Sequence, residues 1–394
     1  MVILVLNCGR SSIKFQVINP ETEERLISGL MSEIGTPRAS FEWEKVEQRH
    51  EETCADITYE AGISLILETI SSGAGQVIDS LEQLDGVGHR VVHGGEAFAD
   101  STLITPEVES AIEAVIPLAP LHNPANLLGI RVCESLLPDS PQVAVFDTAF
   151  HQTLPRQAYL YALPYELYEE HGIRRYGFHG TSHRYVSERA AEIMGEQGNF
   201  ITLHLGNGAS VTAVLEGKSV DTSMGLTPLE GLVMGTRSGD IDPSLVPFIV
   251  ENTGLTLDET ERLLNKKSGL YGLSGGQSDM KVLLERAEQG DEASQRAIDV
   301  FCYRAKKYIG AYMAVLGKVD AIVFTGGIGE NAAAVRAQIC AGLEPYGIEI
   351  DLDANEHGKE RAIISREGTP TTVLVIPTDE ELMIALDTYR IIQG

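Results

Sequence analysis

The residues best suited to bind an anion gather in two stretches of the chain that contain no carboxylate. Residues 171–187 hold three arginines and three histidines, and residues 86–95 hold one arginine and two histidines. The whole chain has a formal net charge of −27, so such stretches are candidate sites for concentrated negative charge. A further arginine, Arg237, lies in the glycine-containing segment 234–240. Taken singly, each of these side chains also fits an ordinary surface or core position, and only their grouping favours a site.

Glycine-rich turns supply the backbone part of an anion site. Two of them, residues 7–12 and 204–210, lie between apolar strands, and a third, residues 325–332, follows a strand and opens a helix. Backbone N–H groups can approach a phosphate closely in such turns, and a helix N-terminus adds a favourable dipole. In the third turn Gly327, Gly329 and Ala332 match the dinucleotide fingerprint. That fingerprint opens a βαβ unit, whereas this one closes a long helical stretch, so we favour contact with an adenosine or its phosphates over an NAD site.

Two other glycine motifs do not complete a functional loop. Gly217-Lys218-Ser219 lacks the preceding glycine of a Walker loop, because Thr212 stands at that position. Residues 272–276 match G-x-S-x-G, but the buried strand that a nucleophile elbow requires does not precede them. The sequence therefore favours neither a P-loop nor a serine hydrolase.

Carboxylates at the ends of predicted elements could hold a metal ion. Asp147 follows the apolar run 143–146, and Glu380 and Glu381 begin the last predicted helix. Mg²⁺ prefers a few such hard oxygens together with water and phosphate. Glycine turns, arginines, a histidine and isolated acids are the parts of phosphoryl transfer, which depends mainly on positioning and charge neutralisation. No nucleophilic base is evident, which fits an acceptor that is already an anion.

Hydrophobic patterning predicts the elements that position these residues. Strands are expected at 2–6, 13–18, 142–146, 201–215 (as strand, turn, strand), 321–324 and 372–376, with further strand-like stretches as far as about residue 57. Helices are expected at 61–72, at 106–116 with Thr105 as the N-cap, over most of 256–317, and from Glu380 to the end.

The second half of the chain repeats the opening pattern of strand, glycine turn and strand. Aligning Gly9 with Gly206 gives an offset of 197 residues, which is half of the 394-residue chain. At that offset three apolar pairs match, namely Leu6 with Leu203, Val17 with Val214, and Ile18 with Leu215. We therefore expect two related α/β lobes packed around a cleft, with two unrelated hairpins as the alternative.

Composition excludes several classes of partner. The excess of acidic residues disfavours nucleic acid and anionic membranes, and no apolar run approaches the length of a membrane span. The N-terminus has no basic leader, so we expect a cytoplasmic protein. The five cysteines are scattered without a C-x-x-C pair, and we expect free, buried thiols instead of disulfides or a zinc site.

Six longer motifs together carry a resemblance. They are N-C-G-x-S-S-x-K-F from residue 7, H-R-V-V-H-G-G from 89, F-D-T-A-F-H from 146, R-Y-G-F-H-G-T-S-H from 175, H-L-G-N-G-A-S from 204, and residues 224–243. With these motifs the chain resembles the acetate kinase family over essentially its whole length, to the closing segment 376–381. The resemblance implies an α/β, two-lobed, actin-like fold (duplicated and ribonuclease H-like) with a central cleft, usually in a homodimer. It divides the chain into an N-terminal lobe for acetate and metal (1–147 with 380–394) and a C-terminal lobe for nucleotide and dimerisation (148–379).

The resemblance also assigns residues, each at its matching motif position. It implies that Asn7 and Glu380 lie beside Mg²⁺, for which Mn²⁺ is an alternative, and that Arg90 holds the acetate carboxylate. It implies that His179 and Arg237 stabilise the transferred phosphoryl group and that Asp147 is a third catalytic residue. The acyl pocket is expected at Val92, Leu121, Phe178 and Pro228, for which ordinary core packing is the alternative. The residues expected around ATP are Lys14, His204, Leu205, Gly206, Asn207, Gly208, Asp279, Met280, Lys281, Gly327, Ile328, Gly329, Glu330 and Asn331.

The family usually assigns Asp147 to proton transfer, and the chemistry argues against this. A carboxylic acid acceptor is already ionised at neutral pH, so little is left to deprotonate. We expect Asp147 to orient Mg²⁺ or an arginine instead.

Three residues depart from the usual family pattern. Arg10 replaces a serine in the first glycine turn, Lys281 replaces an arginine, and Asp379 replaces an asparagine beside Glu380. Arg10 places a long cation near the expected triphosphate, and Lys281 loses the planar fork of an arginine.

The expected activity is reversible, Mg²⁺-dependent transfer of the ATP γ-phosphoryl group to acetate, which gives acetyl phosphate and ADP. Two alternatives stay open at this point. One is a propionate or butyrate kinase, and the other is a nucleotide-gated, actin-like ATPase that binds partner proteins.

Overall fold

The computed structural model describes residues 1–46 and 48–394, which form two compact units. Unit 1 consists of Met1–Gln152 and Asp379–Gly394, and unit 2 consists of Thr153–Thr378. The chain thus enters unit 2 after Gln152, whereas the boundary expected from the sequence was after residue 147. No helix in the described residues is long and apolar enough to cross a membrane.

Unit 1 is built on an eight-stranded sheet whose strand order is β5-β4-β3-β2-β1-β6-β8-β7. Its strands are β1 (Ile3–Cys8), β2 (Ile13–Asn19), β3 (Glu24–Ser32), β4 (Ser40–Lys45), β5 (Gln48–Thr53), β6 (Gly86–Val91), β7 (Thr102–Leu103) and β8 (Gln142–Phe146). Its helices are α1 (Tyr59–Ser71), α2 (Pro106–Ala114), α3 (Asn123–Leu136) and α16 (Glu380–Gln393), with 3₁₀ turns at Gly73–Gly75, Leu81–Gln83, Ile116–Leu118 and Ala149–Thr153. Thr105 caps α2 as expected, since its hydroxyl accepts from the Val108 N–H at 3.4 Å.

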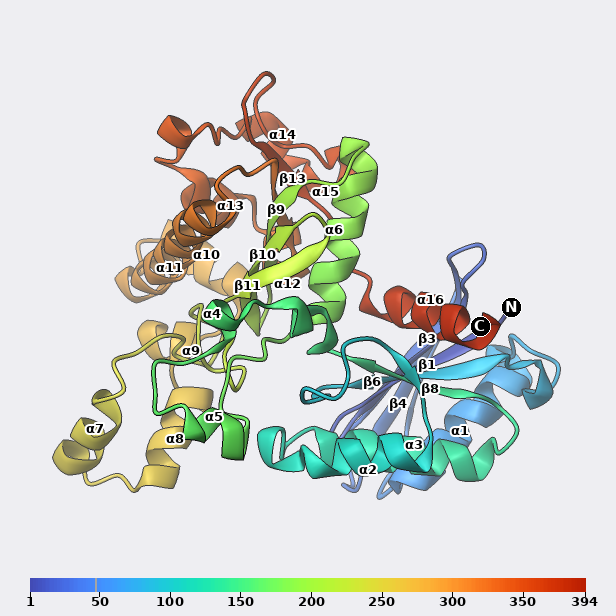
Figure 1. The fold of residues 1–394 in the computed structure, drawn as a ribbon. Helices are drawn as coiled ribbons and strands as arrows, with labels where there is room; N and C mark the ends of the chain where they lie inside the picture. The colour runs from blue at the N-terminus through green and yellow to red at the C-terminus, as the bar shows by residue number, and fades with distance from the viewer. Residues whose placement is uncertain (47) are drawn as a thin grey trace. The chain divides into compact units, whose positions relative to one another are not determined.

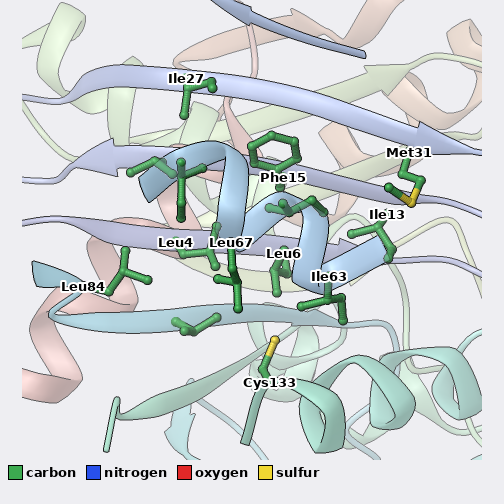
Figure 2. Close-up of a cluster of buried hydrophobic side chains, with 14 of the residues drawn as sticks. Leu4, Leu6, Ile13, Phe15, Ile27, Met31, Ile63, Leu67, Leu84 and Cys133 are labelled. Atoms are coloured by element: carbon green, nitrogen blue, oxygen red, sulfur yellow. The ribbon is translucent and has the colours of Figure 1, made fainter. Parts of the chain in front are cut away.

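The core of unit 1 lies between one face of this sheet and helices α1 and α3. Alternate residues of β1 and β2, such as Leu6 and Phe15, point to the same face because side chains alternate along a strand. Figure 2 shows them packed against Ile63 and Leu67 of α1, with Cys133 of α3 nearby. All five cysteines are free and four of them are buried, so the prediction of free thiols is confirmed.

Unit 2 contains a five-stranded sheet with the order β11-β10-β9-β12-β13. The strands are β9 (Asn199–Leu205), β10 (Ala209–Leu215), β11 (Lys218–Thr222), β12 (Ala321–Thr325) and β13 (Thr372–Val375). The helices are α4 (Arg156–Tyr159), α5 (Glu166–His171), α6 (Gly180–Met194), α7 (Leu245–Thr253), α8 (Leu257–Lys266), α9 (Gly269–Ser274), α10 (Met280–Glu288), α11 (Glu292–Leu316), α12 (Gly326–Asn331), α13 (Ala333–Cys340), α14 (Leu352–Glu356) and α15 (Gly358–Arg361), with a 3₁₀ turn at Glu344–Tyr346.

The two sheets share one topology, in which three antiparallel strands are followed by two parallel ones. In unit 1 these strands are β3-β2-β1-β6-β8, and in unit 2 they are β11-β10-β9-β12-β13. One helix on each sheet comes, in chain order, after a strand of the other unit (Figure 1). Helix α16 follows β13 of unit 2 but packs on β1 and β6 of unit 1. Helix α6 comes after β8 of unit 1 but packs on β9 and β12 of unit 2. The predicted α/β fold with a duplicated unit is thereby confirmed.

The constant offset of 197 residues is wrong for the second strand of each hairpin. The β1–β2 turn has four residues, whereas Gly206–Gly208 joins β9 to β10 with three. Leu4 pairs with Val17, and Ile201, the residue that matches Leu4, pairs with Ala213. Val17 therefore corresponds to Ala213, not to Val214, because the shorter turn shifts the register by one residue.

Buried histidines at the end of β6 predict acid sensitivity of unit 1. Burial lowers the pKa of His89 from 6.5 to about 4, although a hydrogen bond from its Nε2 to Gln142 Oε1 (2.6 Å) opposes the shift. Burial lowers the pKa of His93 to about 4 as well. Because the unfolded chain binds these protons more readily, stability is complete above about pH 6.5 and is lost as the pH falls toward 4.

We expect His89 alone to contribute about 2 kcal/mol to this loss by pH 5. Urea unfolding of wild type and His89→Gln at pH 8 and pH 5 tests this, with the fluorescence of Trp43, the only tryptophan, reporting on the core of unit 1. His89→Gln should show a smaller difference between the two pH values. His171→Gln, which changes an exposed histidine of unit 2, is the control. Equal pH dependence in all three proteins would contradict the assignment.

Candidate active-site residues

Three neighbouring parallel strands of unit 1 each deliver one polar residue at the same edge of the sheet. Asn7 lies near the end of β1, Arg90 near the end of β6, and Asp147 directly after β8. The Arg90 guanidinium donates two hydrogen bonds to the Asp147 carboxylate, from Nε to Oδ1 (3.1 Å) and from Nη2 to Oδ2 (2.6 Å). Its Nη1 donates to Asn7 Oδ1 at 3.3 Å. Carboxyl ends of parallel strands meet at one edge, so the sheet itself places these three side chains together.

Two glutamates at the start of α16 complete this group. Burial raises the pKa of Glu380 to about 7; Arg90 lowers it, and the negative charge of Asp147 adds to the rise. For Arg90, burial lowers the pKa, but the charges of Asp147 and Glu380 outweigh burial and raise it above its ordinary value. The group thus surrounds one half-buried guanidinium with several carboxylates.

Lys14, expected near the nucleotide phosphates, pairs with a carboxylate in this structure. Its Nζ lies 2.5 Å from Oε1 of Glu381, whose side chain is 12% exposed while that of Lys14 is 49% exposed. A phosphate that binds Lys14 must therefore share it with Glu381 or displace that carboxylate. The nucleotide role of Lys14 stays a prediction.

The oxygen donors of unit 1 suit Mg²⁺ better than a softer metal. Asn7 and Glu380 offer an amide and a carboxylate oxygen, and no group of three or more His, Cys, Asp or Glu side chains in the described residues forms a metal cage. Mg²⁺ is usually held by one or two carboxylates plus water and substrate phosphate, whereas structural zinc needs four protein ligands. The donor set therefore fits the implied metal.

Two of the three residues that depart from the usual family pattern, Asp379 and Arg10, lie in unit 1. Asp379 is the N-cap of α16, since its Oδ1 accepts from the Leu382 N–H at 2.8 Å, and burial raises its pKa. Arg10 is exposed in the β1–β2 turn, which is closed by a bond from the Gly9 N–H to the Ser12 carbonyl (2.8 Å).

In unit 2, two cationic or polar donors converge on the glycine turn between β9 and β10. A Cβ atom at Gly208 would lie 3.3 Å from His179 Nε2 and 3.5 Å from Arg237 Nη1. The space that a side chain would fill at Gly208 is therefore next to both donors. The turn itself is closed by the Gly206 N–H, which donates to the Gly208 carbonyl at 3.0 Å, and Gly235 N–H donates to the Asn207 carbonyl at 2.9 Å.

Arg237 is a half-buried arginine without a carboxylate partner among the described residues. Its Nη1 contacts the Pro228 carbonyl at 3.3 Å and Met234 Sδ at 3.5 Å, and burial lowers its pKa. By contrast, Arg175 is paired with Glu230 at 2.6 Å, and Arg174 stacks on the Tyr159 ring. The stretch 171–187 is therefore not one anion site, because these two arginines are used within the protein; Arg237 is the arginine whose charge an anion would compensate.

The histidines beside this turn are held by hydroxyl groups. The His179 ring stacks on His204 with centroids 4.2 Å apart, and its Nδ1 bonds Ser210 Oγ at 2.9 Å. His204 Nδ1 bonds Ser182 Oγ at 2.8 Å, and its Nε2 lies 3.8 Å from the Cβ position of Gly206. His179 has a left-handed backbone (φ +56°) directly before α6, which fixes the direction in which its side chain leaves the main chain.

The third glycine segment packs on the end of β9. A Cβ at Gly326 (φ +75°) would meet the Leu205 carbonyl oxygen at 2.8 Å, whereas a Cβ at Gly327 would meet nothing within 4 Å. Glu330 Oε1 accepts from the N–H groups of Gly326 (3.0 Å) and Thr378 (3.2 Å). The carboxylate of Glu330 is thus occupied by backbone, while Gly327 leaves room for a ligand.

The other predicted residues are more dispersed. Asp279 caps α10 through the Val282 N–H (3.1 Å), Met280 is buried below it, and Lys281 is exposed. Of the four predicted acyl-pocket residues, Val92 and Leu121 belong to unit 1, and Phe178 and Pro228 belong to unit 2. Leu121 is 57% exposed, so ordinary core packing does not explain it.

Comparison with known proteins places this geometry in a family. The model of the acetokinase family matches residues 2–386. The chain belongs to the acetokinase family. It is 55% identical to the acetate kinase of Halothermothrix orenii and 54% identical to that of Thermotoga maritima, with coverage of 99% or more of both chains in each case.

Solved structures give the same result for the fold. The acetate kinase of Porphyromonas gingivalis is 46% identical with a TM-score of 0.95, and a propionate kinase from Francisella tularensis is 47% identical with a TM-score of 0.94; each match covers 99% of both chains. The chain is therefore an acetokinase-family phosphotransferase with the actin-like ATPase fold of its relatives.

Sequence reasoning missed the residues that hold the acetokinase side chains in place. Glu381 was grouped only with the metal carboxylates, and Ser182 and Ser210 were not singled out. The available signal was the spacing of His179 and His183, which places both on one face of a helix, next to a strand that carries serine and threonine hydroxyls.

Gly208 provides a direct test of the anion position. It does not have a positive φ, so alanine is compatible with its backbone, but the added Cβ would occupy the space next to His179 and Arg237. We expect Gly208→Ala to weaken binding of MgATP by at least about tenfold, which corresponds to about 1.4 kcal/mol.

Gly310→Ala is the matched control, because this helical glycine has nothing within 4 Å of its Cβ position. It should bind MgATP normally and unfold at a slightly higher temperature. Isothermal titration calorimetry gives the affinities and differential scanning calorimetry gives the unfolding temperatures. Equal affinity in both variants would remove Gly208 from the site.

Proposed function

We propose that this chain transfers the γ-phosphoryl group of ATP to acetate and forms acetyl phosphate and ADP reversibly. The observation that carries the proposal is the convergence of Arg237 Nη1 and His179 Nε2 at Gly208, where a half-buried guanidinium has no carboxylate partner among the described residues. Transfer of a phosphoryl group needs fixed donors around its equatorial oxygens more than it needs a base. The acetate kinase names of the relatives support the same acceptor.

Arg90 is proposed to bind the acceptor carboxylate. Its guanidinium is 24% exposed and is oriented by the fork on Asp147, whose side chain is only 2% exposed. An ionised carboxylate can attack without losing a proton, so the role of Asp147 is to fix Arg90 and to keep it charged. Val92, Leu121, Phe178 and Pro228 are proposed to contact the acetate methyl group.

Mg²⁺, or Mn²⁺ in its place, is proposed to be held by Asn7 and Glu380. When bound, it neutralises phosphate charge. The chain itself supplies the remaining contacts to the nucleotide: the open turns at Gly206–Gly208 and Gly327, the Nε2 atoms of His179 and His204, and the exposed cation of Lys281.

The protein is further proposed to be a cytoplasmic homodimer, as the family resemblance implies. Large apolar side chains on helices of unit 2 support self-association, since Phe248, Leu257 and Tyr303 are each at least 60% exposed.

Trapping the acyl phosphate tests the reaction itself. With MgATP, acetate and hydroxylamine, we expect acetohydroxamate to form only when acetate is present. ATP consumption without hydroxamate would overturn the proposal and favour an actin-like ATPase. In that case Arg10→Ser would separate an ATPase from an active site blocked by Arg10.

A propionate kinase is the second candidate, favoured by the likeness to the Francisella tularensis protein. A pocket that discriminates one methylene typically does so by about 10- to 200-fold in kcat/KM. We expect acetate to exceed propionate within this range and butyrate to be weaker still. A higher kcat/KM for propionate than for acetate would assign the chain to the second candidate.

Asp147→Asn tests the positioning role of this carboxylate. Removing its charge weakens the fork on Arg90, so we expect the KM for acetate to rise at least tenfold while the shape of the pH profile of kcat is unchanged. Glu113→Gln, which removes an exposed carboxylate paired with Arg131 at 3.1 Å, is the control. If Asp147→Asn instead abolished one limb of the kcat profile with normal Mg²⁺ affinity, proton transfer by Asp147 would replace positioning.

A further inference from the structure

A row of four side chains connects the interior of unit 2 to His179. Thr202 Oγ1 lies 2.7 Å from His183 Nδ1, and His183 Nε2 lies 2.7 Å from Ser210 Oγ. Ser210 Oγ in turn lies 2.9 Å from His179 Nδ1. Thr202 and Ser210 come from the paired strands β9 and β10; His183 lies in the first turn of α6, and His179 directly precedes that helix. Thr202, Ser210 and His183 are fully buried, so water does not exchange freely with this row.

The serine hydroxyl makes the two histidines depend on each other. A hydroxyl group carries one proton, so Ser210 can donate to at most one of the two ring nitrogens. When it donates to one of them, it accepts from the other. If Ser210 donates to His179 Nδ1, then His183 must carry its proton on Nε2, and its Nδ1 accepts from Thr202. If Ser210 donates to His183 instead, every proton in the row is reversed and His179 carries its proton on Nδ1.

The ligand end of the row decides between these two arrangements. His179 Nε2 is the atom next to the Cβ position of Gly208, 3.3 Å away, where the phosphoryl group is proposed to bind. Phosphoryl oxygens without a proton can only accept hydrogen bonds, so Nε2 must carry a proton. In a neutral His179 ring, Nδ1 then carries none and accepts from Ser210.

We propose that Ser210, His183 and Thr202 form a hydrogen-bond relay that holds His179 as a neutral Nε2–H donor to the transferred phosphoryl group. Ser210 and His183 are thus positioning residues for the reaction, since they act through His179. This inference rests on the proposed function, because it takes the ligand to be a phosphoryl group. It assigns a direction to each hydrogen bond: Thr202 to His183, His183 to Ser210, and Ser210 to His179.

Fixing the tautomer in advance has a chemical advantage. A histidine that is free to exchange tautomers presents its donor only part of the time and must reorganise when charge develops on the phosphoryl oxygens. The stack on His204 and the left-handed backbone of His179 fix the plane of the ring, and the relay fixes the proton. His204 is held separately, through Ser182, which in turn bonds Thr378 Oγ1 at 2.8 Å.

The tautomer can be read directly from ring ¹⁵N chemical shifts of the full-length protein labelled at histidine. The probe is acetyl phosphate without ADP, and His179→Gln assigns the signal. In the wild type with acetyl phosphate we expect a proton on Nε2 and a bare Nδ1 in both His179 and His183. In Ser210→Ala we expect the His179 signal to move toward the average of the two tautomers.

Kinetics give a second readout that simple loss of packing would not reproduce. Ser210→Ala should lower kcat by about 10- to 100-fold while the KM values for ATP and acetate change less than about threefold. Ser210→Thr keeps the hydroxyl group and should restore most of kcat. Thr212→Val removes another buried hydroxyl from the same strand, one that bonds Thr222 at 2.9 Å, and should leave both kcat and the His179 signal unchanged.

Thr202→Val tests the far end of the relay if Ser210→Ala does not fold. It should change the His183 signal and lower kcat in the same direction by a smaller factor. A wild type whose His179 carries its proton on Nδ1 with acetyl phosphate bound would overturn the relay, as would an unchanged kcat in Ser210→Ala. If the wild type formed no hydroxamate at all, the proposed function would fail, independently of the ring signals.

Discussion

The arrangement of both candidate sites depends on how the positive charge of each arginine is compensated. Three half-buried arginines show the range of solutions: Arg175 is neutralised by Glu230, Arg90 is held by Asp147, and Arg237 has only a carbonyl and a sulfur atom as polar contacts in the described part of the chain. A buried ion without a counter-ion is costly. A missing carboxylate does not by itself mark a ligand site, because among the described residues the fully buried Arg336 also bonds only carbonyl and amide oxygens. At Arg237 the guanidinium also lies next to His179 and the Cβ position of Gly208, and there we propose that a bound anion compensates its charge.

One sheet topology, used twice, provides two kinds of chemistry. In unit 1 the edge formed by β1, β6 and β8 carries side chains, because Asn7, Arg90 and Asp147 fill the strand ends. In unit 2 the corresponding edge carries glycine, since Gly206–Gly208 follows β9 and Gly326 follows β12. A Cβ at Gly326 would meet the backbone of Leu205. Side chains suit the binding of a small carboxylate and a metal, and bare backbone suits the close approach of phosphates. The fold sets the place, and the residues at the strand ends set the chemistry.

Local signals in the sequence predicted most strands to within two residues at each end, but they did not predict helices α3 and α6. The apolar run before Asp147 predicted β8 to the residue, and periodicity predicted α10. Contacts between distant segments were beyond reach. The pairing of Lys14 with Glu381 joins the two ends of the chain, and the pairing of Arg175 with Glu230 removed one arginine from the expected anion site. The hairpin register was wrong because one residue fewer in a glycine turn leaves the hydrophobic pattern almost unchanged while it shifts every pair.

The net charge of −27 and the proposed polyphosphate substrate are compatible because they act at different distances. At physiological salt the field of surface carboxylates decays over about 8 Å, so it slows the approach of an anion more than it weakens its final contacts. The proposed contacts at Gly208 would be made by the half-buried side chains of His179 and Arg237, where the effective dielectric constant is lower than in water and each hydrogen bond is stronger. Neutral donors such as the Nε2–H of a histidine and backbone N–H groups add no charge that must be desolvated. A turn built from glycine, a histidine of fixed tautomer and one unpaired arginine can therefore bind phosphate within an acidic protein.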